Sequence, residues 1–184
     1  GQPLFNEDES IVLVYNGEIY NFQALAGELS ALGHAFRTHS DTEVIIKSFH
    51  AWGADCVQRF HGMFAFAVAE RDTGRLTLMR DRLGIKPLYF AEVPGGLRFA
   101  STLPALVAAG DIDTDVDPVA LHHYMHFHAV VPAPHTILRG VRKLPPATIK
   151  AVEPCGAQRE RLYWEPLFAT PADEKGLGFV DWQD

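Results

Sequence analysis

The chain has 184 residues, of which 47% are hydrophobic and 21% are charged, and its formal net charge is −7. This composition is ordinary for a globular domain, and the length allows one sizeable core. Lys and Arg form no run or stripe, which argues against a nucleic-acid partner because phosphates require clustered positive charge. No apolar run approaches the ~20 residues of a membrane-spanning helix, and residues 1–3 do not open a signal peptide. We therefore expect no membrane partner.

The sulfur and imidazole side chains give little sign of a metal site. The two cysteines, Cys56 and Cys155, are too few for a disulfide framework, so we expect a reducing, cytoplasmic setting. His122 and His126 would share one face of a helix, but no carboxylate lies within that run. The spacings typical of zinc sites are missing as well, so no metal is expected.

The chain opens with a strand and a helix. Residues 11–15 form a short β-branched run that ends at Asn16-Gly17, a pattern that predicts a strand followed by a tight turn. Apolar residues at helical spacing predict a helix over 22–32, with Asn21 as its N-cap and Gly33 as its end.

A second helix should follow a short strand over 34–38. Ser40 and Glu43 have the spacing of a capping box, in which the Ser40 hydroxyl accepts from the third helical amide and Glu43 reaches back. The helix behind it should run over 44–52 and end at Gly53.

The middle of the chain is rich in strands, and the last part is mixed. Strands are expected over 63–69, 75–80, 88–92, 97–100 and 147–152. Asp117-Pro118 is typical of a helix start and predicts a helix to about residue 125. Residues 166–184 are weakly patterned and are interpreted as a linker.

Helices packed over a meander of strands indicate an α+β fold. The segment 63–69 is apolar on both faces, so both must be covered. We expect the sheet that holds 11–15 and the sheet that holds 63–69 to bury each other. The bulky face of Phe64, Phe66 and Val68 should meet the opposing sheet, and the alanine face should lie under a helix. Asn16 and Asp41 should converge at one end of the sheets.

Three segments stand out together: NGEIYN at 16–21, SDTE at 40–43 and RDRLGIKPLY at 80–89. With GMFAFA at 62–67 and FAS at 99–101, they resemble the glutaminase domain of asparagine synthetases, which are class II glutamine amidotransferases. The resemblance covers roughly residues 1–165 and implies a four-layer αββα sandwich of the N-terminal-nucleophile hydrolase type. Residues 126–134 and 141–148 look more like those of N-acetylglutaminylglutamine amidotransferases, which belong to the same superfamily.

The first motif suits the stabilisation of an oxyanion. Amide hydrolysis by a thiol passes through a tetrahedral oxyanion, which preorganised donors stabilise. The side-chain amide of Asn16 and the backbone N–H of Gly17 are such donors, and the resemblance implies that they form the oxyanion hole. From spacing alone, a plain Asn-Gly hairpin turn is the favoured explanation of the pair, because Asn-Gly is the commonest short turn signal.

The resemblance gives two acidic residues a role in binding glutamine. It implies that Glu18 contacts the substrate and that Asp41 binds its α-ammonium group. Spacing alone would explain Asp41 as an acid that complements the dipole of its helix. Arg80-Asp81 and Lys86-Pro87 are interpreted as a solvated, salt-bridged loop, because the resemblance implies duties in fold and interface more than in catalysis. Residues 83–85 are interpreted as packing.

The resemblance also implies parts that this sequence lacks. The family's nucleophile is an N-terminal cysteine, and residue 1 matches a point several dozen residues into the family pattern. We therefore expect residues 1–165 to be a glutaminase domain truncated at its N-terminus and inactive alone. Residues 166–184 would lead to a synthetase domain that uses ATP and Mg²⁺ to activate a carboxylate.

The implied partners are glutamine and this synthetase domain, and a homodimer is left open. This domain itself should need no cofactor. The main alternative is a non-catalytic pseudo-glutaminase that serves as a binding or oligomerisation module.

Overall fold

The computed structural model describes residues 2–167. Its larger sheet contains β1 (Leu4–Phe5), β2 (Ile11–Ile19), β3 (Gly62–Glu70), β4 (Arg75–Arg80), β8 (Thr148–Val152) and β9 (Gln158–Leu162). Its smaller sheet contains β5 (Tyr89–Val93), β6 (Gly96–Ala100) and β7 (Arg142–Lys143). The helices are α1 (Phe22–Ala31), α2 (Asp41–Trp52), the 3₁₀ helix η1 (Gly53–Arg59), α3 (Leu103–Ala108) and α4 (Pro118–His126).

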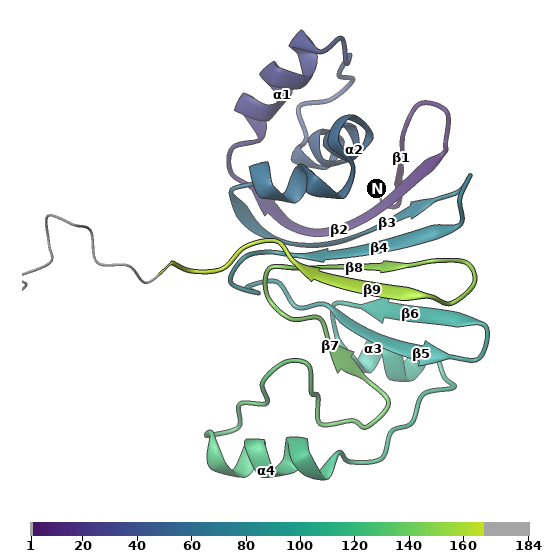
Figure 1. Ribbon diagram of the computed structural model, residues 1–184, viewed down its shortest axis with the longest axis vertical. Coiled ribbons are helices and arrows are strands. Elements are labelled where there is room, and N and C mark those ends of the chain that lie inside the picture. Colours follow the sequence, from purple (N-terminus) through teal and green to yellow (C-terminus); the bar gives the residue numbers. More distant parts are fainter. Residues whose placement is uncertain (1, 168–184) are drawn as a thin grey trace, which may run out of the picture.

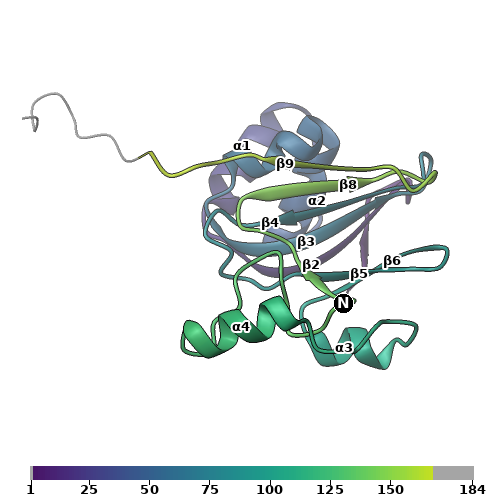
Figure 2. The same ribbon diagram turned by 60° about the horizontal axis from the view of Figure 1, so that its bottom comes forward.

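These elements are arranged as helices, sheet, sheet and helices. The strand orders are β1-β2-β3-β4-β8-β9 and β6-β5-β7, and every strand pair is antiparallel. Figure 1 shows α1 and α2 on one side of the larger sheet and the smaller sheet on its other side, with α3 and α4 beyond. Turning the molecule brings α3 and α4 forward on that same side (Figure 2). The predicted α+β class is confirmed.

The elements predicted from sequence patterns are mostly present. The three predicted helices are confirmed as α1, α2 and α4, whereas β1, β7, β9 and α3 were not predicted. The expected strand over 34–38 is wrong, because the Arg37 and Thr38 amides donate to the Glu43 carboxylate instead of to a neighbouring strand. In the described part of the chain, no helix is both long and apolar enough to cross a bilayer. The predicted linker at 166–184 lies almost wholly outside the described residues.

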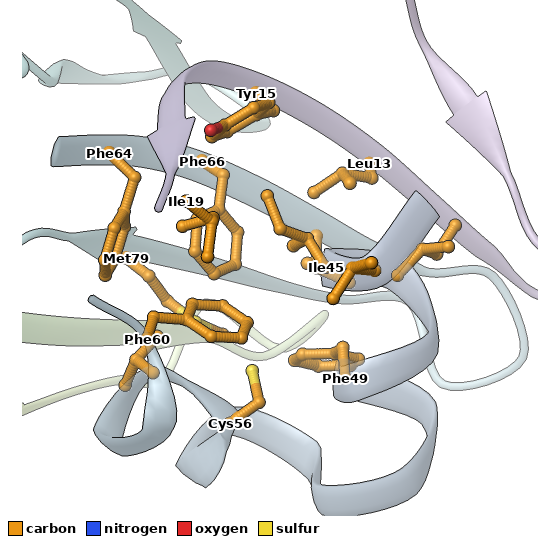
Figure 3. Close-up of a cluster of buried hydrophobic side chains, with 14 of the residues drawn as sticks. Leu13, Tyr15, Ile19, Ile45, Phe49, Cys56, Phe60, Phe64, Phe66 and Met79 are labelled. Carbon is orange, nitrogen blue, oxygen red and sulfur yellow. The ribbon is translucent and has the colours of Figure 1, made fainter. Parts of the chain in front are cut away.

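The arrangement of the two sheets differs from the prediction. Segments 11–15 and 63–69 do not oppose each other, because β2 and β3 are hydrogen-bonded neighbours in one sheet. The bulky face of β3 lies under the helices, where Phe64 and Phe66 join Ile45 of α2 in the main core (Figure 3). The alanine face meets the smaller sheet instead. Its short side chains leave room for large residues in and next to the strands of that sheet, namely Phe90 of β5, Leu88 just before β5 and Leu144 just after β7.

Two glycines let β2 and β3 approach closely at one end. Gly17 has φ +149°, and a Cβ there would lie 2.2 Å from the Met63 carbonyl oxygen. A Cβ on Gly62 would lie 2.2 Å from the Glu18 carbonyl oxygen. The predicted turn at Asn16-Gly17 is therefore wrong: both residues lie inside β2, paired with Ala65 and Phe64. Asn-Gly serves here to relieve backbone crowding in a strand, which is another use of glycine's missing side chain.

The segment after β4 is anchored by two buried charged side chains. The Asp81 carboxylate, 1% exposed, accepts from four backbone amides at 2.9–3.2 Å, those of Phe64, Leu83, Ile85 and Lys86. The Arg80 guanidinium donates to the carbonyls of Gly84, Lys86 and Leu144. These bonds fix the segment in the fold. The interpretation as a solvated, salt-bridged loop is wrong, because Arg80 and Asp81 are buried and bond to backbone groups. The interpretation of residues 83–85 as packing is wrong for the side chains, because Leu83 and Ile85 are 70% and 56% exposed.

Replacing Gly62 by alanine should destabilise the fold, because the added methyl group would collide with the backbone of β2. We expect Gly62→Ala to lower the free energy of unfolding by about 1–3 kcal/mol, as overpacking typically does. Urea denaturation would measure this. Gly27→Ala is the matched control, since a Cβ at Gly27 of α1 meets nothing within 4 Å. An equal loss in both variants would contradict the proposed crowding.

Replacing Asp81 by asparagine tests the amide cluster at nearly constant shape. Asparagine has one acceptor oxygen, so its amide group would point at backbone N–H donors that the carboxylate satisfied. Each carboxylate oxygen accepts from two amides, so we expect Asp81→Asn to lower the free energy of unfolding by ~2–6 kcal/mol, about 1–3 for each of two buried donors left unpaired. The control is Asp72→Asn in the exposed turn before β4. A loss no larger than that of the control would contradict this role.

Candidate functional site

The backbone amides at the end of β2 alternate between two edges. The Tyr15 amide donates to the Gln2 side chain at 2.9 Å, and the Gln2 side chain donates to the Tyr15 carbonyl. The Ile19 amide donates to Asp41 Oδ2 at 3.1 Å. The Tyr15 and Ile19 amides thus both point away from β3, whereas the Tyr20 amide donates to the His61 carbonyl on the β3 side.

This alternation directs the Gly17 amide to the edge of β2 that faces away from β3. Phe64, the register partner of Gly17, uses its N–H and its carbonyl for Asp81 on the far side of β3. Gly17 and Phe64 therefore form a non-hydrogen-bonded pair of the ladder. The Gly17 amide lies between two neighbours whose amides are occupied, those of Tyr15 and Ile19.

The start of α2 places Asp41 beside this edge. Asp41 is the first helical residue, and its Oδ2 accepts from both the Ile19 amide and, at 2.7 Å, the Tyr15 hydroxyl. Its Oδ1 has only a 3.4 Å contact with the Thr42 hydroxyl. The half-buried carboxylate thus keeps one oxygen with spare capacity as an acceptor. An anionic group with such an oxygen can bind a cation.

The predicted capping box forms only in part. Ser40 caps α2, but its hydroxyl accepts from the Thr42 amide, which is the second helical amide and not the third. Glu43 does not reach back to Ser40, because its carboxylate takes three bonds from Arg37 and Thr38. The loop before the helix competes for this carboxylate, and the sequence spacing alone could not show that.

Asn16 directs its side chain to the opposite face of β2. Its Nδ2 donates to the Ser101 hydroxyl, just after β6, at 3.3 Å. Its register partner Ala65 belongs to the core between the sheets. Glu18 is exposed on the same strand. Asn16 and Asp41 therefore lie at the same end of the larger sheet, but their hydrogen bonds run on opposite faces.

Asn21, the last residue of the first motif, has a role that sequence reasoning missed. Asn21 occupies the predicted N-cap position of α1, but its side chain makes no cap bond there. Instead it donates to the Arg59 carbonyl and accepts from the His61 amide, both at 2.9 Å. This clamp joins the exit of β2 to the entry of β3 and holds the paired strand ends in place.

The nearest described cleft does not include the predicted site residues. It has a volume of about 380 Å³ and lies between β1 and α2. Gln2, which pairs with Tyr15, and Thr42, which contacts Asp41, both line it. Asn16 and Asp41 do not line it, so a glutamine pocket shared by these two residues stays a prediction.

Neither cysteine is placed to act at this end of the sheet. Cys56 is fully buried in η1, and burial raises the pKa of its thiol, so the thiol stays protonated. Cys155 is exposed in the turn between β8 and β9. By strand register, that turn lies at the Ile11 end of the sheet, opposite Gly17. Among residues 2–167, no three His, Cys, Asp or Glu side chains group as metal ligands.

Comparison with known proteins assigns the chain to a family. The model of the glutamine amidotransferase domain family matches residues 1–164. The chain is 37% identical over 168 residues to asparagine synthetase (glutamine-hydrolysing) 1 of Bacillus subtilis, covering 91% of this chain and 26% of that protein. It is 45% identical over 137 residues to a putative asparagine synthetase of Mycobacterium tuberculosis, covering 72% and 21%. The chain thus spans about a quarter of the length of these relatives.

A solved structure supports the same fold. Glutamine phosphoribosylpyrophosphate amidotransferase from B. subtilis superimposes with a TM-score of 0.61 at 18% identity, covering 90% of this chain and 32% of that one. The chain belongs to the class II glutamine amidotransferase domain family and is related to the glutaminase domains of asparagine synthetases.

Proposed function

We propose that this domain hydrolyses glutamine and supplies the ammonia to an ATP-activated carboxylate in the same protein. In this proposal the Gly17 N–H and the Asn16 side-chain amide bind the oxyanion, Asp41 binds the α-ammonium group of glutamine, and Glu18 contacts the substrate. Family membership supports the reaction class. The observation that carries the proposal is the direction of the Gly17 amide. It points to the edge of β2 away from β3, two residues along the strand from the Ile19 amide that Asp41 binds.

The Gly17 amide suits an oxyanion donor for two reasons. Its ladder position leaves it without a bond to its register partner, so it need not break one to bind substrate. Gly62 and the Asn21 clamp also fix the strand that holds it, which makes the donor preorganised. Preorganised donors need no rearrangement as charge develops in the transition state.

The distance along β2 matches the length of glutamine. Two residues of an extended strand span ~6.6 Å, which separates the Gly17 amide from the Ile19 amide bound to Asp41. The five bonds from the α-nitrogen of glutamine to its amide oxygen, each roughly 1.2–1.5 Å, span about 6 Å when extended. One glutamine could therefore reach both groups, with its amide at Gly17 and its ammonium at Asp41.

The rest of the proposal follows the family resemblance. The attacking group would be the thiol of the family's N-terminal cysteine, on the N-terminal-nucleophile hydrolase fold, with residues 1–165 as the glutaminase domain. ATP and Mg²⁺ would act in a synthetase domain of the same protein. The acceptor carboxylate, aspartate or a dipeptide as in N-acetylglutaminylglutamine amidotransferases, would be chosen there. A homodimer stays a prediction, as does a cytoplasmic location.

The first test of the site concerns the chemical step. In the full-length protein that carries this domain, Asn16→Ala should lower kcat for glutamate release by ~10²–10³-fold and leave KM nearly unchanged, because the oxyanion forms only in the transition state. Steady-state glutamate release measures both constants. An unchanged kcat would remove Asn16 from the oxyanion hole. A wild-type protein without glutamate release would favour the alternative of a non-catalytic binding module.

The second test concerns ground-state binding. Asp41→Ala should raise KM for glutamine by ~10–100-fold with a smaller change in kcat, because the lost ion pair contributes equally to substrate and transition state. Asp72→Ala, in the exposed turn before β4, is the control for removal of one negative charge. If Asp41→Ala and Asn16→Ala changed the same constant to the same extent, the proposed division of roles would be wrong.

A further inference from the structure

Tyr15 stands out as a buried phenol that hydrogen-bonds to a proposed substrate-binding residue. It is 8% exposed, and its ring packs in the main core among Leu13, Ile19 and Phe66 (Figure 3). Its hydroxyl donates to Asp41 Oδ2 at 2.7 Å. The residue precedes the NGEIYN motif, which does not include it.

The two donors on Oδ2 fix the direction of the Asp41 carboxylate. The Tyr15 hydroxyl and the Ile19 amide both bind Oδ2, whereas Oδ1 has only the 3.4 Å contact with Thr42. A carboxylate held through one oxygen cannot rotate freely, so Oδ1 is kept as the acceptor for a ligand. Burial and the bond to Asp41 raise the pKa of Tyr15, so the phenol keeps its proton and always acts as the donor.

We propose that Tyr15 is a positioning residue that orients Asp41 toward the α-ammonium group of glutamine. The inference rests on the proposed function, because it needs Asp41 to bind that group. A phenylalanine could fill the same space in the core, so the hydroxyl contributes the bond to Asp41 and little packing. Without it, the carboxylate keeps the Ile19 bond alone and can turn away from the ligand.

The test compares two substrates that differ only in the α-ammonium group. These are glutamine and its des-amino analogue, glutaramate, assayed by release of ammonia from the full-length protein. Tyr15→Phe should raise KM for glutamine about tenfold, the usual effect of losing a hydrogen bond to a charged group. It should leave kcat for glutamine and both constants for glutaramate within about twofold of the wild type.

Tyr163→Phe is the matched control. Tyr163 is a partly buried phenol packed against the main core, and its hydroxyl donates to the neutral carbonyl of Arg80 at 2.9 Å. This hydroxyl does not bond to Asp41, so Tyr163→Phe should not change the ratio of KM for glutamine to KM for glutaramate. A structural effect of Tyr15→Phe would raise KM for both substrates alike, and that result would overturn the proposal.

Asp41→Ala separates the inference from the proposed function. Suppose that Asp41→Ala raises KM for glutamine but not for glutaramate, while Tyr15→Phe changes neither KM. Tyr15 then has no positioning role, and the binding role of Asp41 stands. If Asp41→Ala does not discriminate between the substrates, the ammonium site itself is wrong. In the double variant, Tyr15→Phe should add no further effect on KM, because the carboxylate that it orients is gone. Additive effects would contradict the proposed pathway through Asp41.

Discussion

The close pairing of β2 and β3 at Gly17 and Gly62 is the constraint on which the rest of the site depends. Each glycine lies where a side chain would collide with the backbone of the other strand. The pairing aligns Gly17 with Phe64, whose backbone groups turn to Asp81 on the far side. The Gly17 amide must then face the opposite edge, beside Asp41. One contact between two backbones thereby fixes the direction of the proposed oxyanion donor.

Two aspartates near these strands illustrate how hydrogen bonding decides between structure and binding. Asp81 is buried and accepts from four backbone amides, so it has little capacity left for a ligand. Asp41 is half-buried, and both of its strong bonds fall on one oxygen. The same functional group is thus a structural anchor in the first case and a binding candidate in the second. The number and placement of donors make this difference, and composition cannot reveal it.

The sequence predicted the elements well because apolar periodicity is a local property. It placed α1, α2, α4 and the strands β3 to β6 and β8, and it identified the motifs at 16–21 and 40–43, which meet at the end of β2. It failed where the outcome depended on distant partners. Asn16-Gly17 has the local signature of a turn, but β3 continues to pair with it. The spacing of Ser40 and Glu43 allowed Glu43 to accept from the Ser40 amide, but its carboxylate accepts from the Arg37 and Thr38 amides instead.

The two faces of β3 show the same limit. Counting apolar residues showed correctly that both faces are covered, but not which partner covers each one. The alanine face accommodates the large side chains of the smaller sheet, and the phenylalanine face fills the space under α2. Either assignment satisfies the burial of apolar area. Only the complementary shapes of partners distant in sequence decide between them, and those shapes require the fold.

Side chains surround the proposed site because, in the described part of the chain, β1 pairs with β2 only at Val12 and Leu13. An edge strand presents unpaired backbone groups that invite pairing with another chain. Here β1 pairs with Val12 and Leu13. The Gln2 side chain bonds to both the N–H and the carbonyl of Tyr15, as a neighbouring strand would. The Asp41 carboxylate accepts from the Ile19 amide. These bonds occupy the amides on both sides of Gly17. These bonds satisfy an edge that would otherwise be a liability, while the Gly17 amide between them stays directed away from β3, where the proposed substrate would bind.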